Sequence, residues 1–380
     1  MKITRCHGLD TLRAAAIIIV FMFHCFGFSH PHVFSSIGAP SGWVGVELFF
    51  VLSGYLISNQ IFSAQHQFSL KIFYYRRFLR TLPNYFVVVG LYFLIPAFGE
   101  KPLITPLWKF ITFTQNFNLS AGAFSHAWSL CLEEQFYLVF PLVALLFIRK
   151  RFVRKGSARA GWLTVGLILF FGIILRSTLW IVYIQDAGGD IHQIYMNKIY
   201  YPPFCRLDGL VLGVSIAMLQ NFHKEAWERM TSRGNWFLML GLLGCYFTFY
   251  PLPDLCGFIP TAFGYLLRCA SFAALTLAAL SPNTVLHKTK IPGAMTLSAW
   301  SYAIYLTHKS FIHITHVVLS RWNIGESSMV TVMVEIILSL AGGWILYTCI
   351  ETPFLKLRDK LEQAKSTELI LGGNLNRSLG

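Results

Sequence analysis

Residues 161–184 read GWLTVGLILFFGIILRSTLWIVYI and contain one charged side chain, Arg176. A helix of about 20 residues crosses the hydrocarbon core of a bilayer, so this run predicts a membrane-spanning helix. The whole chain has the same character, because 55% of its 380 residues are hydrophobic, 16% are aromatic and only 13% are charged. Ordinary globular proteins carry about 25% charged residues, so the composition excludes an average soluble protein and predicts an integral membrane protein.

Together with other apolar runs of similar length, this stretch predicts about ten transmembrane helices and an all-α, polytopic helix bundle. The runs cover residues 11–29, 43–62, 82–97, 128–148, 161–184, 204–220, 236–250, 260–281, 299–318 and 328–350. The stretch 103–118 is apolar but short and broken by proline, which favours an interfacial or re-entrant segment. No loop is long enough for a soluble domain, so we expect one membrane domain over 1–353 and a partly disordered cytoplasmic tail over 354–380.

The formal net charge of +14 would suggest a nucleic-acid partner in a soluble domain, but the positions of the charges favour another explanation. Most of the 31 Lys and Arg residues fall on the side of the N-terminus. The predicted loops on the opposite side hold only Lys101, Lys109, Lys198 and Arg321. Basic loops remain in the cytoplasm, so both termini are predicted to be cytoplasmic. We expect membrane lipids as partners and no nucleic acid.

The eight cysteines show no Cys-x-x-Cys pairing, and most lie in or beside the predicted spans, which is typical of small buried residues. His308, His313 and His316 are unevenly spaced, which argues against a metal site. The sequence therefore predicts neither a metal centre nor a tightly bound cofactor.

Ionisable side chains within membrane spans are costly and are therefore candidates for function. The first predicted helix carries Arg13 near its cytoplasmic end and His24 eleven residues later. Eleven residues turn a helix to roughly 20° beyond three turns, so both side chains share one face, about 16 Å apart along the axis. The alternative is an arginine that reaches lipid phosphates and a histidine that only packs.

The fourth predicted span places Glu133 and Glu134 at a depth similar to that of His24. Adjacent residues on a helix point about 100° apart, so we interpret one glutamate as facing His24 and the other as facing a cation, Arg206 or Arg176. A carboxylate that orients a histidine is typical of general base catalysis. A buried ion-pair network that holds the helices together is the alternative.

Polar side chains on three other spans are expected to converge on the same interior site. They are Glu47, Ser53, Arg206, Asp208 and His308. With the first and fourth spans, five predicted helices contribute ionisable groups, so the sequence predicts a polar site within the bundle.

Several strings in the chain resemble the membrane acyltransferase-3 family of bacterial O-acetyltransferases. They are Leu9-Asp10-Thr11-Leu12-Arg13-Ala14 leading to His24, GVELFFVLSG over 45–54, Arg76-Arg77 with Arg80 and Pro83, Trp128-Ser129-Leu130 with EEQFY over 133–137, RLDGL over 206–210, and SYAIYLTH over 301–308. Glu351 and Pro353 follow directly after the last predicted span and also match the family pattern. Each string is modest alone, whereas six in this order are highly specific.

The resemblance implies an enzyme that takes an acyl group, usually acetyl, from a cytoplasmic coenzyme A thioester and delivers it to a hydroxyl. Typical acceptors in the family are sugars of O-antigen, capsule, peptidoglycan or other glycans, and some members acylate small molecules such as macrolides. Acyl-CoA is then a co-substrate, and the location is the bacterial cytoplasmic (inner) membrane. Some relatives carry an extracytoplasmic esterase-like domain after the bundle, and we expect this chain to have none.

The chain departs from the family pattern at three sites. Cys131-Leu132 stands where small or β-branched residues are frequent, Glu47 where aspartate is common, and Lys309 where an apolar or aromatic residue is usual. The first two changes are mild. Lys309 reflects either the choice of acceptor or an internal ion pair with Glu335.

A mechanism follows as a hypothesis. The arginines of the loop before the third span bind the coenzyme A phosphates, and Arg13 meets the phosphate end or the entry of the pantetheine arm. These loop arginines are Arg76, Arg77 and Arg80, and binding of lipid headgroups is the alternative for them. His24 acts as general base on the acceptor hydroxyl or as a transient acyl carrier, oriented by Glu133 or Glu134.

Two other classes of protein compete with an enzyme. A proton-coupled transporter or flippase also buries His, Glu and Arg, but the chain shows neither an internal repeat nor paired interrupted helices. A non-catalytic membrane partner leaves the buried charges unexplained.

Overall fold

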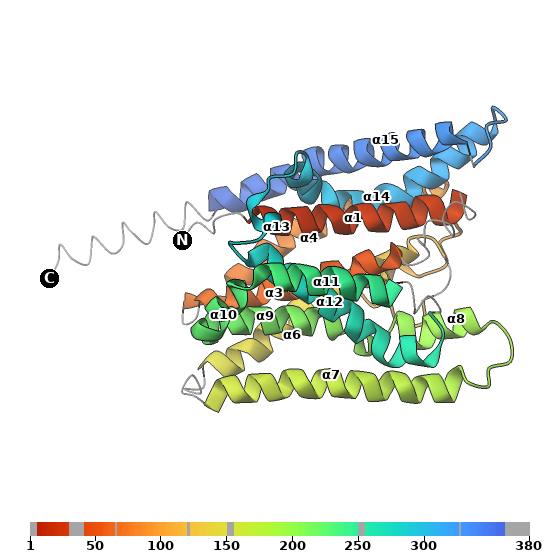
Figure 1. The fold of residues 1–380 in the computed structure, drawn as a ribbon. Helices are drawn as coiled ribbons and strands as arrows, with labels where there is room; N and C mark the ends of the chain where they lie inside the picture. Colours follow the sequence, from red (N-terminus) through yellow and green to blue (C-terminus); the bar gives the residue numbers. More distant parts are fainter. Residues whose placement is uncertain are drawn as a thin grey trace.

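The computed structural model describes residues 6–29, 42–64, 67–119, 122–149, 156–249, 255–326 and 328–361. Helices account for most of these residues, and no strand occurs among them. In Figure 1 the long helices lie side by side along one common direction. The predicted all-α helix bundle is therefore confirmed.

Each of the ten predicted apolar runs coincides with a long helix in the described part of the chain. These helices are α1 (His7–Ser29), α3 (Gly45–Ala64), α4 (Leu70–Leu94), α6 (Trp128–Arg149), α7 (Gly156–Tyr183), α9 (Asp208–Phe222), α11 (Gly234–Phe249), α12 (Tyr265–Leu280), α14 (Ala294–Ser320) and α15 (Met329–Leu346). Short helices connect some of them: α5 (Leu107–Ile111), α8 (Ile191–Tyr195), α10 (Lys224–Thr231) and α13 (Val285–Lys288). A π-helical turn over Tyr347–Glu351 continues α15.

The outer surface of the bundle is apolar, as a lipid solvent requires. Six helices of the described residues are long and apolar enough to cross a membrane, namely α1, α3, α6, α7, α12 and α15 with its extension. The helix α7 exposes large apolar side chains along its length, among them Leu163, Phe170 and Phe171. Such side chains are stable next to lipid rather than water. The chain is a multi-pass membrane protein.

The helix α4 begins earlier than the predicted span at residue 82. Ser69 caps its first turn, with its hydroxyl accepting a hydrogen bond from the backbone N–H of Ile72 at 3.5 Å. Arg77 and Arg80 therefore lie on a regular helix, and the prediction that they belong to a loop is wrong. A helix fixes their direction, and it turns the face of α4 that carries them toward the bundle interior, where the neighbouring Phe73 and Asn84 are buried.

Glycines allow α3 and α9 to pack at very short range. A Cβ atom on Gly54 would lie 2.1 Å from the backbone oxygen of Leu210, and one on Gly213 would lie 2.3 Å from that of Val51. Small residues that bring backbones together are a common means of helix association in membranes. The contact fixes α3, which carries Glu47 and Ser53, against the start of α9.

Replacing Gly54 by alanine should therefore destabilise the bundle. The added methyl group meets backbone rather than a movable side chain, so we expect a loss of about 1–3 kcal/mol, as for overpacked cores. Gly90 on α4 is the matched control, because a Cβ atom there meets nothing within 4 Å. Thermal unfolding in detergent should show a lower melting temperature for Gly54→Ala only. Equal melting of both variants would contradict the close packing.

The segment 103–118 folds back into the bundle. Its Phe110 and Asn116 are buried, and Gln135 of α6 donates hydrogen bonds to Asn116 Oδ1 at 3.1 Å and to the backbone oxygen of Phe113 at 2.8 Å. Contacts of this kind with a spanning helix favour the re-entrant alternative over the interfacial one.

The two ends of the bundle differ in chemistry. Figure 1 shows that α1 begins and α15 ends on the left side of the view, and that the connection from α14 to α15 lies on the right. We call the first side the basic end, because the arginines of α4 lie there. We call the second side the cavity end, because His24, Asp190 and other residues there line a cavity. Since basic segments remain in the cytoplasm, the basic end is the one predicted to be cytoplasmic.

Candidate active site

Two histidines from different helices lie in contact near the cavity end. Nδ1 of His24 on α1 lies 3.0 Å from Nε2 of His308 on α14, and 3.0 Å from the backbone oxygen of Val20. Nδ1 of His308 lies 3.0 Å and 2.9 Å from the backbone oxygens of Ile304 and Tyr305. The structure thus brings together two residues that the sequence placed on separate spans.

These contacts determine which ring nitrogens carry hydrogen. A carbonyl oxygen only accepts, so Nδ1 of His308 is the N–H donor and Nε2 of the neutral ring is the acceptor. Nδ1 of His24 must then donate to His308 and Val20. The lone pair of His24 is consequently on Nε2, which is the nitrogen that can accept a proton as a general base.

His24 lines a cavity of about 450 Å³ at the cavity end. Other wall residues come from the turn before α6, from the region of α8 and from the last turns of α14, including Ser125, Asp190, Lys309 and His316. Ligand sites typically enclose about 300–1,000 Å³ and carry a few polar groups that orient the ligand. The cavity is therefore large enough for a polar molecule whose reactive group approaches His24.

Neither glutamate of α6 contacts His24, so the interpretation that Glu133 or Glu134 orients this histidine is wrong. Glu133 accepts hydrogen bonds from Ser53 Oγ and from the hydroxyl of Tyr137, both at 3.0 Å. Glu134 interacts most strongly with Arg77 and Thr81. The carboxylates belong to the arginine cluster described next, and His308 occupies the position expected for them.

Three arginines from α1 and α4 form a basic cluster. The charges of Arg13, Arg77 and Arg80 all interact with one another, and Glu133 and Tyr137 are close to Arg13. The guanidinium of Arg77 also lies 4.5 Å from the centre of the Tyr137 ring. The carboxylates of Glu133 and Glu134 offset part of this positive charge, and the guanidinium groups retain N–H donors of the kind that bind anions.

Arg76 is not among the groups that interact most strongly with Arg13 or Arg80. Its role in binding stays a prediction from the sequence.

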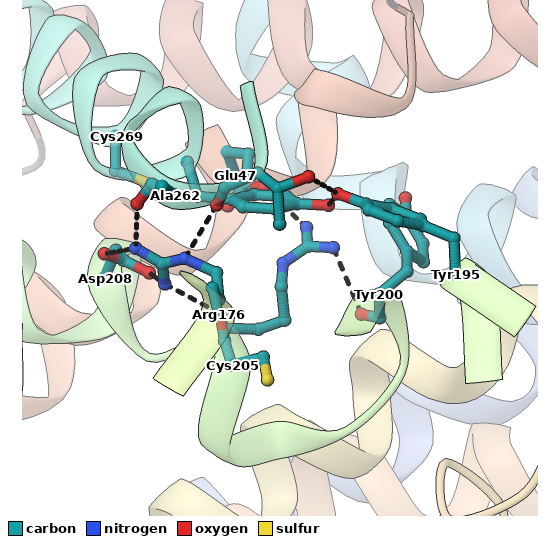
Figure 2. Close-up of polar contacts among 11 residues, drawn as sticks. Glu47, Arg176, Tyr195, Tyr200, Cys205, Asp208, Ala262 and Cys269 are labelled. Atoms are coloured by element: carbon teal, nitrogen blue, oxygen red, sulfur yellow. Dashed lines mark hydrogen bonds and ion pairs between the residues drawn. The ribbon is translucent and has the colours of Figure 1, made fainter. Parts of the chain in front are cut away.

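The predicted residues Glu47, Arg206 and Asp208 form buried ion pairs away from the cavity. Arg206 binds Glu47 at 2.5 Å, and Arg176 binds both oxygens of Asp208, at 2.6 Å and 3.1 Å. Figure 2 shows Arg176 pointing to Asp208 and to the backbone oxygen of Cys205, which it reaches at 2.9 Å. These pairs replace the predicted contacts of Arg206 and Arg176 with the α6 glutamates.

Aromatic rings complete the surroundings of Arg206. Its guanidinium lies 4.3 Å from the ring centres of both Tyr200 and Tyr265 and 4.9 Å from that of Trp128. Cation–π contacts and the Glu47 carboxylate together compensate for burial of this charge. We assign Glu47, Arg206 and Asp208 to the support of the fold, because each is held in a buried ion pair away from the three clustered histidines.

Lys309 forms an ion pair with Glu100, at 2.8 Å, in place of the pair with Glu335 that the sequence left open as one alternative. Glu335 instead contacts His316 and accepts a hydrogen bond from the thiol of Cys25 at 2.7 Å. Burial favours the neutral form of Glu100, but the Lys309 ammonium outweighs this effect and lowers the pKa of Glu100. The ion pair therefore persists at neutral pH and places a fixed dipole in the cavity wall.

A third histidine, His126, lies beside His24 and His308, and no sequence pattern predicted it. Its ring centre is 6.2 Å from that of His24 and 5.2 Å from that of His308. It precedes α6 in a 3-10 turn (Ser125–Ala127), outside the predicted span. The sequence feature that could have identified it is its position two residues before the Trp128-Ser129 string. Among the described residues, no group of three or more His, Cys, Asp or Glu side chains has the geometry of a metal site.

A family model described as "Acyltransferase domain" matches residues 7–348. The chain belongs to this acyltransferase family. Nearly the whole bundle is covered, from the start of α1 to the end of α15, so the acyltransferase domain includes both histidines, the cavity and the basic cluster.

Curated relatives of this acyltransferase domain include the peptidoglycan O-acetyltransferase OatA of Listeria monocytogenes, 27% identical over 380 residues, which cover 92% of this chain and 56% of the relative. The O-acetyltransferase OatA of Staphylococcus aureus strain NCTC 8325 is 25% identical over 373 residues, which cover 92% of this chain and 57% of the relative. The chain thus spans little more than half the length of these relatives. No solved structure matches it.

Proposed function

We propose that the protein is a membrane O-acyltransferase that moves an acyl group, usually acetyl, from cytoplasmic acyl-CoA to a hydroxyl of a cell-surface glycan in the bacterial inner membrane. The observation that carries the proposal is the arrangement of α1, which has a basic cluster near its beginning and, near its end, a cavity histidine held in the tautomer of a general base. The names of the relatives, which are O-acetyltransferases, support the same reaction.

The donor binds at the basic end. Coenzyme A carries several phosphate oxygens, and guanidinium groups bind phosphates through paired hydrogen bonds. Arg13, Arg77 and Arg80 supply three such groups at one place in the bundle. The distance of about 16 Å between Arg13 and His24 along α1 is spanned by the pantetheine arm, which brings the thioester to the cavity.

The acceptor enters from the cavity end. Sugars present many hydroxyl groups and bind through multiple hydrogen bonds, which the polar wall residues Asp190, Lys309 and His316 provide. O-antigen and peptidoglycan units both have this chemistry. A glycan hydroxyl beside His24 Nε2 loses its proton as it attacks the thioester carbon.

His308 is a positioning residue in this scheme. It holds His24 in the tautomer with the lone pair on Nε2, and its own ring is fixed by two backbone oxygens. Once His24 gains a proton, the His308 ring stabilises the cation through the same hydrogen bond.

The basic cluster should control affinity for the donor. Replacing Arg77 and Arg80 together by alanine removes two guanidinium groups, and each charged hydrogen bond contributes about 1.5–3 kcal/mol. We therefore expect the Kd for acetyl-CoA to rise by at least about tenfold, measured by isothermal titration calorimetry in detergent. Lys71→Ala, which removes an exposed charge from the same helix, is the control. Wild-type affinity of the double arginine variant would contradict the donor site.

Purified protein incubated with labelled acetyl-CoA and a panel of glycans tests the function itself. We expect labelled ester on a glycan and free coenzyme A as products. A macrolide in the same panel tests the small-molecule acceptors. Mass spectrometry of the protein without acceptor separates the two possible roles of His24, general base and transient acyl carrier. Only a transient carrier leaves an acetyl group on His24.

A further inference from the structure

His126 is a buried histidine whose two ring nitrogens have no hydrogen-bond partner among the described residues. Its side chain is only 4% exposed. The backbone of Leu306 on α14 is near the ring, but outside the geometry of a hydrogen bond. A neutral imidazole always presents one N–H donor and one acceptor, and burying either without a partner costs free energy. Native proteins retain few such groups, and those that persist call for an explanation such as a ligand that completes them.

The turn that carries His126 restricts the position of its ring. The backbone oxygen of His126 accepts hydrogen bonds from the hydroxyl of Tyr305 at 2.8 Å and from Ser129 Oγ at 3.5 Å. Phe124, two residues earlier, has a φ of 59°, a left-handed conformation that is costly for a bulky residue. Backbone strain of this kind persists where the surrounding structure enforces it, often at functional sites.

The neighbours of His126 belong to the proposed catalytic site. Its ring lies next to those of His24 and His308, and Ser125, the preceding residue, lines the cavity. The N–H of His24 is donated to the His308 ring and to the backbone oxygen of Val20, and the N–H of His308 is donated to backbone oxygens of α14. Of the three clustered imidazoles, His126 is therefore the one whose donor remains available.

We propose that His126 is a catalytic residue that donates its ring N–H to the carbonyl oxygen of the acyl group during transfer. The inference rests on the proposed acyltransferase function. As the acceptor oxygen bonds to the thioester carbon, the π electron pair of the carbonyl moves onto its oxygen, and the hydroxyl proton passes to His24. The C=O bond then re-forms, the C–S bond breaks, and the thiolate takes the proton from His24.

This sequence yields one ester and one thiol, and His24 and His126 return to their starting states. The negative charge is transient and lies on the acyl oxygen, which is where a donor in a water-poor site is most effective. Removing one such donor from other acyl-transfer enzymes lowers kcat by about 10²–10³-fold. A bound acyl oxygen would also give the buried N–H of His126 the partner that it lacks.

The experiment compares His126→Leu with His126→Asn in purified protein. Leucine fills similar space without a donor, so kcat should fall by about 10²–10³-fold while the KM for acetyl-CoA is unchanged. The melting temperature should equal or exceed that of the wild type, because an unsatisfied polar group has been removed. Asparagine retains an N–H donor and should recover part of the lost rate.

His223→Leu is the control, since His223 accepts a hydrogen bond from Trp162 far from the cavity and its loss should leave kcat unchanged. The proposal is overturned if His126→Leu keeps wild-type kcat. It is also overturned if both His126 variants melt earlier and lose activity equally, which is the pattern of a packing role. A wild type that forms no ester overturns the proposed function and this inference together, whereas an active wild type makes the two variants a test of His126 alone.

Discussion

Alanine in place of His24 should lower the rate of acyl transfer by at least about 100-fold, with the yield of folded protein unchanged. General bases contribute about 10²–10⁴-fold to rates, and the hydrogen bonds of His24 place its lone pair on Nε2 at the cavity wall. The measurement is steady-state formation of acetylated acceptor by purified protein, with thermal unfolding recorded on the same samples.

A companion variant, His308→Gln, separates base from positioning residue. Glutamine can accept from His24 Nδ1 but lacks the delocalised ring, so kcat should fall less than in His24→Ala, and its dependence on pH should shift. The KM for acetyl-CoA should not change. Substantial turnover by His24→Ala would remove this histidine from the mechanism.

Replacing Asp208 by asparagine should destabilise the bundle by about 3–5 kcal/mol. Arg176 is fully buried, and its two hydrogen bonds to Asp208 are the compensation for its charge. Its other partners, the backbone oxygens of Thr261, Cys205 and Ala262, are neutral. Removing the carboxylate therefore leaves a buried cation with neutral partners alone.

The structure offers a matched control for this change in Arg358 and Asp359, an exposed pair at 2.7 Å. Exposed pairs contribute about 0–1 kcal/mol, so Asp359→Asn should melt close to the wild type. Thermal unfolding in detergent compares the two. A melting temperature of Asp208→Asn equal to that of Asp359→Asn would show that the buried pair contributes little.

The apolar runs predicted the helices because length and low charge alone determine which segments are stable in lipid. The boundary of α4 was the main error, since Arg76, Arg77 and Arg80 made its first turns look like a loop. A capped amphipathic start can carry charge when one face is turned toward a polar interior. The prolines and the short length of 103–118 left an interfacial and a re-entrant segment open, and the contacts with Gln135 favour the second.

The pairing of charges was harder to predict than their presence. Helical periodicity fixes the face on which Glu133 lies but not which helix packs against that face, so its contact with Ser53 replaced the expected one with His24. The partner of Lys309 is Glu100, which lies between α4 and α5 rather than on a span. His126 lies in a turn, where no periodic pattern marks a residue.

The most direct test uses proteoliposomes that contain the protein, labelled acetyl-CoA on the side of the basic end and a glycan acceptor on the side of the cavity end. We expect labelled ester on the glycan, free coenzyme A on the donor side, and neither product with His24→Ala. Labelled acetyl-CoA or unmodified glycan crossing the membrane without ester formation would contradict the proposed function, because that outcome is the behaviour of a transporter.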